Sequence, residues 1–213
     1  GEHSKRGKVC FSPYVWVHTP SLQPSEGQGA TSWPAGVGSG RSTPLEMSIS
    51  RTQASAVSFK RKSDGGGVLI AGGMAYPTPE QAKHYHLEIV VQPTDVIDYV
   101  HKDDEGNWTI TYNFGKLSVP RLDMATACVG TKVLFAGGAT CTECLYKNST
   151  ITSANFRCTD AIDVYDFELD KWTIIAMTVQ RKNLVIAVNL TAAYLVAGQD
   201  DLGPVANVEM YDP

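Results

Sequence analysis

The sequence predicts an all-β protein built from repeated short sheets in a radial or stacked array. Three times an apolar strand runs straight into a glycine turn, within residues 68–73, 133–138 and 194–199. These turns are 65 and 61 residues apart, and a repeat of this length made of short strands is typical of such arrays. The strands before the glycines are apolar on both faces, as expected of a strand that lies between two neighbouring sheets.

Four residue types recur in the same order around each glycine turn. Glycine permits the positive φ of a sharp turn, and large aromatic side chains fill the space between adjacent sheets. In the third segment Gln199 takes the place of the second glycine, and the sequence ends at Pro213 before a third tryptophan. The recurring residues are Arg51, Arg121 and Arg181, then Gly72, Gly73, Gly137, Gly138 and Gly198, then Tyr99, Tyr165 and Tyr211, then Trp108 and Trp172.

These segments resemble kelch repeats, the units of kelch-type β-propellers. The middle copy carries the resemblance best, in Arg121, the run 133–138, the run 163–166 and Trp172, and the resemblance covers residues 50 to 213. The sequence departs from the family pattern at Gln199 and at Val100, where the family often has Asp after Tyr. The resemblance implies four-stranded antiparallel blades that form an incomplete propeller within this chain.

The chain divides into an N-terminal strand with a linker and a set of blades. Residues 1–48 hold a predicted strand at 9–17 and a segment, 21–44, in which 13 of 24 residues are Gly, Pro or Ser. Residues 49–213 hold the blades, at 49–117, 118–176 and an incomplete 177–213. In the second blade the predicted strands are 124–129, 132–136, 161–167 and 171–175.

Two blades and a third without its last strand are too few to close a ring. Three explanations stay open: a fragment of a longer chain, several chains that combine their blades, and an open stack of sheets. We expect Val15 and Trp16 to complete the third blade, either within the chain or as a strand donated to a neighbouring chain. An unpaired blade edge would otherwise be prone to association.

Long insertions separate the glycine turn from the tyrosine in the first two copies. They span 26 and 27 residues, against 12 in the third copy. Equivalent loops emerge on one face of a propeller, so this face is a candidate binding surface or assembly contact. Variable loops without a function are the alternative.

Three of the five cysteines lie in the second insertion. Cys128 lies in a predicted core strand, and Cys10 in the N-terminal strand. A disulfide from Cys158 to Cys141 or Cys144 would stabilise a loop with few apolar anchors. A zinc half-site at the CxxC pair and a fully reduced set are the alternatives.

Three N-glycosylation sequons begin at Asn107, Asn148 and Asn189. All three fall in predicted turns or loops, where a glycan requires exposure. Together with the loop cysteines they favour an extracellular or cell-surface protein with N-linked glycans. The alternative is a cytoplasmic propeller in which the sequons occur by chance.

Composition and motifs argue against several other functions. The net charge of −4 and the pI near 5.7 disfavour nucleic acid as a partner, and no apolar run is long enough for a transmembrane segment. Kelch-type enzymes include copper oxidases and sialic acid mutarotases, but the copper site needs two His, a Tyr and a Tyr crosslinked to Cys. Here His84 and His86 lie on either side of Tyr85 in the first long loop, and a solvated loop explains them better than a metal. We therefore assign no catalytic residue, metal or cofactor.

The sequence predicts a non-catalytic protein-interaction or structural module. It would assemble through blade edges or long loops, with a protein partner or with itself as a homo-oligomer or filament. Two alternatives stay open: an intracellular kelch adaptor domain, and a fragment of a kelch-type oxidase or mutarotase-like enzyme.

Overall fold

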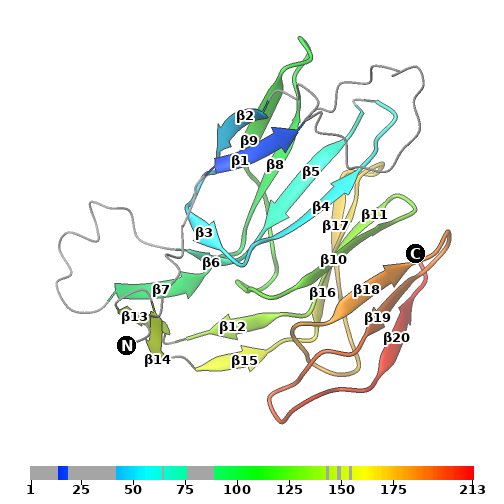
Figure 1. Cartoon of the computed structure of the whole chain (residues 1–213). Helices are drawn as coiled ribbons and strands as arrows, with labels where there is room; N and C mark the ends of the chain where they lie inside the picture. The colour runs from blue at the N-terminus through cyan, green and yellow to red at the C-terminus, as the bar shows by residue number, and fades with distance from the viewer. Residues whose placement is uncertain are drawn as a thin grey trace, which may run out of the picture.

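The computed structural model describes residues 14–18, 42–63, 65–75, 89–142, 144–147, 150–153 and 155–213. All regular secondary structure in these residues is β, which confirms the all-β prediction (Figure 1). No described helix has the length or apolar character to cross a membrane.

Three antiparallel sheets follow one another along the chain, and in each of them the spatial order of strands equals the chain order. Sheet 1 contains β4 (Ser55–Phe59), β5 (Gly67–Ala71), β8 (Val96–Lys102) and β9 (Trp108–Lys116). Sheet 2 contains β10 (Ala125–Val129), β11 (Lys132–Ala136), β16 (Ala161–Asp166) and β17 (Lys171–Ala176). Sheet 3 contains β18 (Val185–Val188), β19 (Ala193–Val196) and β20 (Val208–Tyr211).

The predicted strands of the second segment are confirmed to within one residue at each end. The apolar runs and the tight turns between them mark these limits clearly in the sequence. Strand β16 is buried at all six positions, because sheet 2 is covered on both faces by its neighbours.

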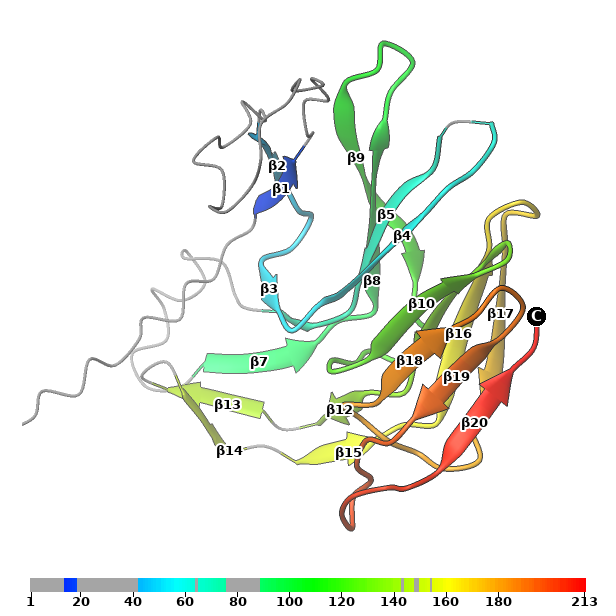
Figure 2. The same ribbon diagram turned by 45° about the vertical axis from the view of Figure 1, so that its right-hand side comes forward.

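Successive sheets pack face to face, and their first strands β4, β10 and β18 lie side by side (Figures 1 and 2). The junction of sheets 1 and 2 buries an aromatic-rich cluster that includes Phe59, Tyr99, Phe135, Tyr165 and Phe167. The junction of sheets 2 and 3 buries mainly aliphatic residues, among them Leu134, Ile162 and Leu195. Burial of apolar side chains between the sheets is thus the main attraction that holds them together.

The two insertions join each other. The first contains β6 (Met74–Ala75) and β7 (Ile89–Pro93), and the second contains β12 (Ala139–Cys141), β13 (Cys144–Lys147), β14 (Thr150–Ser153) and β15 (Phe156–Cys158). Strand β7 pairs with β13, so that a five-stranded sheet, ordered β14-β13-β7-β6-β3, spans both insertions. Strand β3 (Arg51–Thr52) completes it, and Figure 2 shows this sheet below sheet 1.

The N-terminal strand β1 (Tyr14–His18) pairs with β2 (Ser42–Glu46). Val15 lies opposite Leu45 and Trp16 opposite Pro44. The prediction that Val15 and Trp16 complete the third blade within the chain is therefore wrong. A partner about 30 residues away costs less loop-closure entropy than one at the far end of the chain.

The hydrogen-bond register corrects the alignment of the third glycine turn. The amides of Gly72, Gly137 and Ala197 donate to equivalent carbonyls of the third strand or its start, at 3.1, 2.9 and 3.3 Å. Their φ angles are 62°, 61° and 56°. Ala197 therefore replaces the first glycine, and Gly198 occupies the position of Gly73 and Gly138. Gln199 does not replace the second glycine.

The register also corrects the tyrosine and tryptophan positions in sheet 1. Val68 pairs with Val100, as Val133 pairs with Tyr165. Val100, and not Tyr99, thus occupies the Tyr165 position, and Tyr99 points to the opposite face of its sheet. Ile110, which pairs with Val100, occupies the position of Trp172, and Trp108 lies two residues away. A one-residue shift along a strand reverses the face of a side chain.

The glycine turns predict a graded response to substitution. Ala197 has a left-handed backbone conformation, with φ of 56°, which is strained for alanine but not for glycine. Ala197→Gly is therefore expected to raise the free energy of unfolding by up to about 1 kcal/mol. Gly137→Ala is expected to lower it by roughly 2–3 kcal/mol, because the new Cβ would overlap the carbonyl oxygen of Arg181.

The matched control is Gly130→Ala, where φ is 57° but no atom lies within 4 Å of the new Cβ. It isolates the backbone cost of about 1 kcal/mol. Urea unfolding measures all three variants. Equal losses for Gly137→Ala and Gly130→Ala would contradict the assigned contact.

Candidate interaction surface

The three recurring arginines are buried and ion-paired. The distances from guanidinium to carboxylate are 2.9 Å for Arg51 and Asp98, 2.5 Å for Arg121 and Asp163, and 2.6 Å for Arg181 and Glu209. All three arginine side chains are fully buried. Each pair lies where a segment enters its sheet.

Each carboxylate also binds the backbone just before the arginine of its own pair. It accepts a hydrogen bond from the backbone amide of Ser48, Ser118 or Thr178, three residues before the arginine. The guanidinium of Arg121 donates to the carbonyl of Phe135 at 3.0 Å, and that of Arg51 to Ile70 at 3.2 Å. No ion pair was predicted for these acidic residues, although Asp163 belongs to the kelch-like run 163–166. The sequence does carry a signal for these ion pairs: Ser/Thr-x-x-Arg occurs three times, and each copy is followed by an acidic residue in the third strand of the sheet.

Burial lowers the pKa of Arg51 and of Arg121, although Asp98 and Asp163 partly offset it. Arginine nevertheless stays charged at any physiological pH. Because each charge is neutralised by a partner in the same segment, these groups join strands and do not face a substrate.

We expect Arg121→Met to lower the free energy of unfolding by about 3–5 kcal/mol, since it leaves the Asp163 carboxylate buried without its counter-ion. Lys116→Met is the control, because the exposed Lys116 forms a pair at 3.6 Å with the half-buried Asp95, and the loss of this pair should cost less than about 1 kcal/mol. The double variant Arg121→Met with Asp163→Leu should recover part of the loss. Equal effects of the two single variants in urea unfolding would contradict the role of the buried pair.

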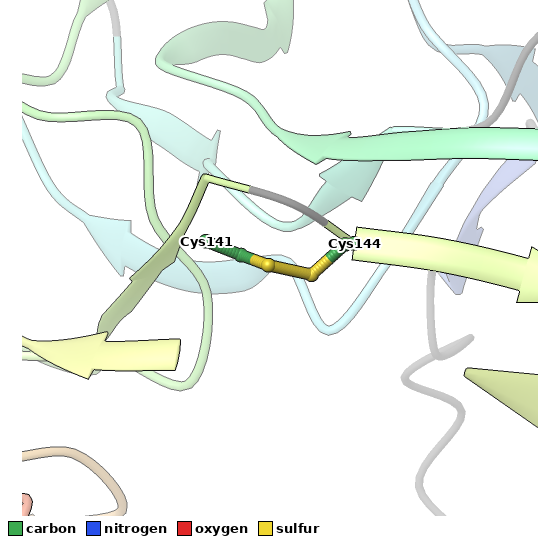
Figure 3. The surroundings of a disulfide bond; sticks show 2 residues. All are labelled: Cys141 and Cys144. Carbon is green, nitrogen blue, oxygen red and sulfur yellow. A yellow bond between two sulfur atoms is a disulfide. The ribbon is translucent and has the colours of Figure 1, made fainter. Parts of the chain in front are cut away.

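The disulfide joins Cys141 to Cys144, at the end of β12 and the start of β13 (Figure 3). Their Cα atoms lie 6.1 Å apart, and both residues are buried with Met74, Val91 and Leu122 in the core of the insertions. The predicted bond to Cys158 is wrong.

Cys158 lies elsewhere because of the strand register. It pairs with Ala139, whereas Cys141 pairs with Phe156. Its thiol donates to the carbonyl of Gln199 at 3.4 Å. Burial, with the nearby Asp201, raises the pKa of this thiol to about 11, so it stays protonated at neutral pH.

Two sequons are exposed in the described residues. Asn107 follows β8 in the turn to β9, and Asn189 lies in the turn between β18 and β19. The Asn189 side-chain oxygen accepts from the amides of Thr191 and Ala192, at 2.9 and 2.8 Å. Both turns lie away from the insertions (Figure 1). Asn148 lies outside the described residues.

Sheet 3 presents an exposed apolar face, which we call the outer face. Directly paired residues share a face of a sheet, so the register places six residues together. Val185, Val208 and Met210 are 63%, 61% and 63% exposed. The outer face consists of Val185, Ala187, Tyr194, Val196, Val208 and Met210.

The equivalent faces of the other two sheets are buried. In sheet 2, Ala136, Ile162 and Val164 pack against sheet 3. In sheet 1, Ala71 and Ile97 pack against sheet 2. The outer face therefore has the same apolar character as these two buried faces, but no described residues cover it. Contiguous apolar surface of this kind marks interaction sites.

A shallow pocket of about 150 Å³ lies on the face of sheet 2 whose residue Val164 also packs against sheet 3. Lys132 and Asp166 form an ion pair at 2.6 Å in its wall. Burial alone would raise the pKa of Asp166, but hydrogen bonds from Lys132 and two backbone amides outweigh it and hold the pKa below its ordinary value. The lining residues are Lys132, Val164, Asp166, Leu169, Lys171 and Thr173.

In the described part of the chain, no three His, Cys, Asp or Glu side chains gather as metal ligands do. His84 and His86 lie outside it.

No protein-family model matches the chain, and no curated protein matches it. Among solved structures, one titled "Structure of YjhT" is similar, with a TM-score of 0.52 and 15% sequence identity. The similarity covers 80% of this chain and 49% of that one, so the chain spans about half the length of the YjhT structure. At this identity the likeness concerns the fold alone.

Proposed function

We propose that this chain is a non-catalytic interaction module of kelch-like propeller blades that associates with a second copy of itself through the outer face of sheet 3. The exposed apolar outer face is the observation that carries the proposal. The repeated ion pair at each segment start and the face-to-face packing of the sheets support the propeller-like architecture.

Ala197 argues for a second copy instead of a further repeat on this face. At the two existing junctions, a Cβ on Gly72 or Gly137 would overlap the carbonyl oxygen of the next arginine. A further repeat docked in the same way would bring such a carbonyl onto the Cβ of Ala197. A second copy can instead pack its outer face on this one, without that contact.

The composition of the outer face suits such self-pairing. Its six residues are apolar apart from the hydroxyl of Tyr194, and none is charged. A symmetric dimer places the same surface on both sides of the interface. An uncharged face meets no like-charge repulsion when it does so, and its aliphatic side chains gain by leaving water.

Light scattering over a range of concentrations tests the proposal. We expect a mass above the 23.0 kDa of one chain, because the outer face pairs in solution. Val185→Asp should weaken association at least tenfold, since a charge in an apolar interface costs more than about 1.4 kcal/mol.

Ile174→Asp is the matched control, because Ile174 on β17 has the same exposure of 63% as Val185 and lies outside the outer face. It should associate like the unmodified chain. A monomer at every concentration, or equal effects of the two substitutions, would overturn the proposal.

The proposal includes an extracellular or cell-surface location with N-linked glycans. The Cys141–Cys144 disulfide favours an oxidising compartment, and Asn107 and Asn189 are exposed in turns. Both features agree with passage through a secretory pathway.

Expression through a eukaryotic secretory pathway tests the location. We expect glycosidase-sensitive mass on the chain, reduced by one glycan in Asn189→Gln and by one in Asn107→Gln. Intact mass spectrometry measures each step. A secreted chain of bare polypeptide mass would contradict glycosylation at these positions.

A further inference from the structure

We propose that the disulfide between Cys141 and Cys144 is a redox-sensitive latch, which holds the two insertions together and releases them when a dithiol reduces it. This inference goes beyond the proposed function and does not rest on the outer face of sheet 3. It concerns the five-stranded sheet to which both insertions contribute.

The disulfide lies where the chain passes from one sheet to another. Cys141 is the last residue of β12, which pairs with β15 inside the second insertion. Cys144 is the first residue of β13, which pairs with β7 of the first insertion. The bond thus ties the two ends of a short bend (Figure 3). Because β13 must leave β12 in a fixed direction to meet β7, a covalent tie across the bend favours that pairing.

The strand pairing that the bond supports is short. Strands β7 and β13 are joined at three residue pairs, from Cys144 opposite Val91 to Tyr146 opposite Ile89. No other strand pairing among the described residues connects the first insertion to the second. A short ladder between two long loops lies at the low end of local stability. A constraint at its first pair therefore has a large effect on how often the ladder opens.

The insertions have a hydrophobic core of their own. In it Met74 and Val91 from the first insertion pack with Leu122, Cys141 and Cys144. These buried residues belong to neither of the two clusters at the junctions of the sheets. Loss of the disulfide should therefore loosen the insertions and leave sheets 1, 2 and 3 packed, because burial between the sheets involves neither cysteine.

The spacing of the two cysteines makes the bond act locally. It closes a loop of residues 141–144 alone, so it removes little conformational entropy from the unfolded chain as a whole. After reduction the two thiols stay three positions apart in the sequence, and their high effective concentration favours re-formation of the bond on oxidation. Such a bond suits a reversible local change better than general stabilisation of the fold.

The release is a thiol–disulfide exchange in which atoms and electrons balance. A thiolate of the dithiol attacks the sulfur of Cys141, which lies next to the exposed Thr142, and the Cys144 sulfur leaves as a thiolate. The second thiol of the reductant then attacks the mixed disulfide and releases the Cys141 thiolate. The two protein sulfurs gain two electrons and take up the two protons that the reductant loses, and the dithiol becomes a disulfide.

The free thiol of Cys158 is not part of the latch. It lies on β15 opposite Ala139 and donates to the carbonyl of Gln199. Burial raises its pKa to about 11, and a thiol that stays protonated does not attack a disulfide. Cys158→Ser should therefore leave the response to the reductant unchanged, which makes it the matched control.

Native reduction followed by hydrogen exchange tests the proposal on the full chain. The oxidised chain is treated with dithiothreitol at neutral pH without denaturant, and differential alkylation with mass spectrometry measures the thiols of Cys141 and Cys144. We expect both to become alkylated, and the amides of β7 and β13 to exchange faster by at least about tenfold. Amides of β11 and β16 in sheet 2 should exchange as before, and reoxidation should restore slow exchange in the insertions.

A variant without the bond separates the latch from a side effect of the reductant. Cys141→Ala combined with Cys144→Ala should show fast exchange at β7 and β13 before any dithiol is added, and should not respond to it. Val185→Asp should respond to the dithiol like the unmodified chain, so failure of outer-face association and failure of the latch are distinguishable.

Three results would overturn the proposal. The first is a bond that dithiothreitol reduces only after the chain is unfolded. The second is alkylation of both cysteines with unchanged exchange at β7 and β13. The third is an equal increase of exchange in sheets 1 and 2, which would make the bond a support of the whole fold.

Discussion

The buried arginine–carboxylate pair is the interaction on which the rest of this structure depends. In each segment it joins the residue that enters the sheet to the third strand, as between Arg121 and Asp163. The backbone of the same arginine then accepts the amide of the preceding glycine turn, as between Arg121 and Gly73 at 2.9 Å. The side chain of Arg121 thus joins two parts of sheet 2, and its backbone carbonyl joins sheet 2 to the glycine turn of sheet 1. Such a pair must be complete, because half of it would be an uncompensated buried charge.

Packing on both faces follows from this arrangement. Strand β16 is buried throughout because a sheet lies on either side, whereas the outer face of sheet 3 has the same apolar pattern and stays exposed. The outer face is therefore a surface of the kind that the repeat buries elsewhere.

The insertions act as a second connection between sheets 1 and 2. Their pairing through β7 and β13 crosses from one segment to the next, and the Cys141–Cys144 disulfide holds the turn that leads into β13. This five-stranded sheet uses the long loops to join neighbouring segments. The β8–β9 and β18–β19 turns, which contain the two described sequons, lie away from it in Figure 1, so glycans there would leave it accessible.

The sequence by itself determined the β class, the strand limits of sheet 2 and the recurring arginines, because apolar runs and glycine turns are local signals. The tertiary structure decided the features that depend on register or on distant pairing. Ala197 in place of a glycine, and Val100 in place of Tyr99, follow from hydrogen bonds between strands, and a one-residue shift reverses every face. The partner of Cys141 depended on how β12 meets β15. The exposure of the outer face also depends on tertiary structure. The equivalent faces of sheets 1 and 2 are buried by the next sheet, and exposure is a property of neighbours and not of composition.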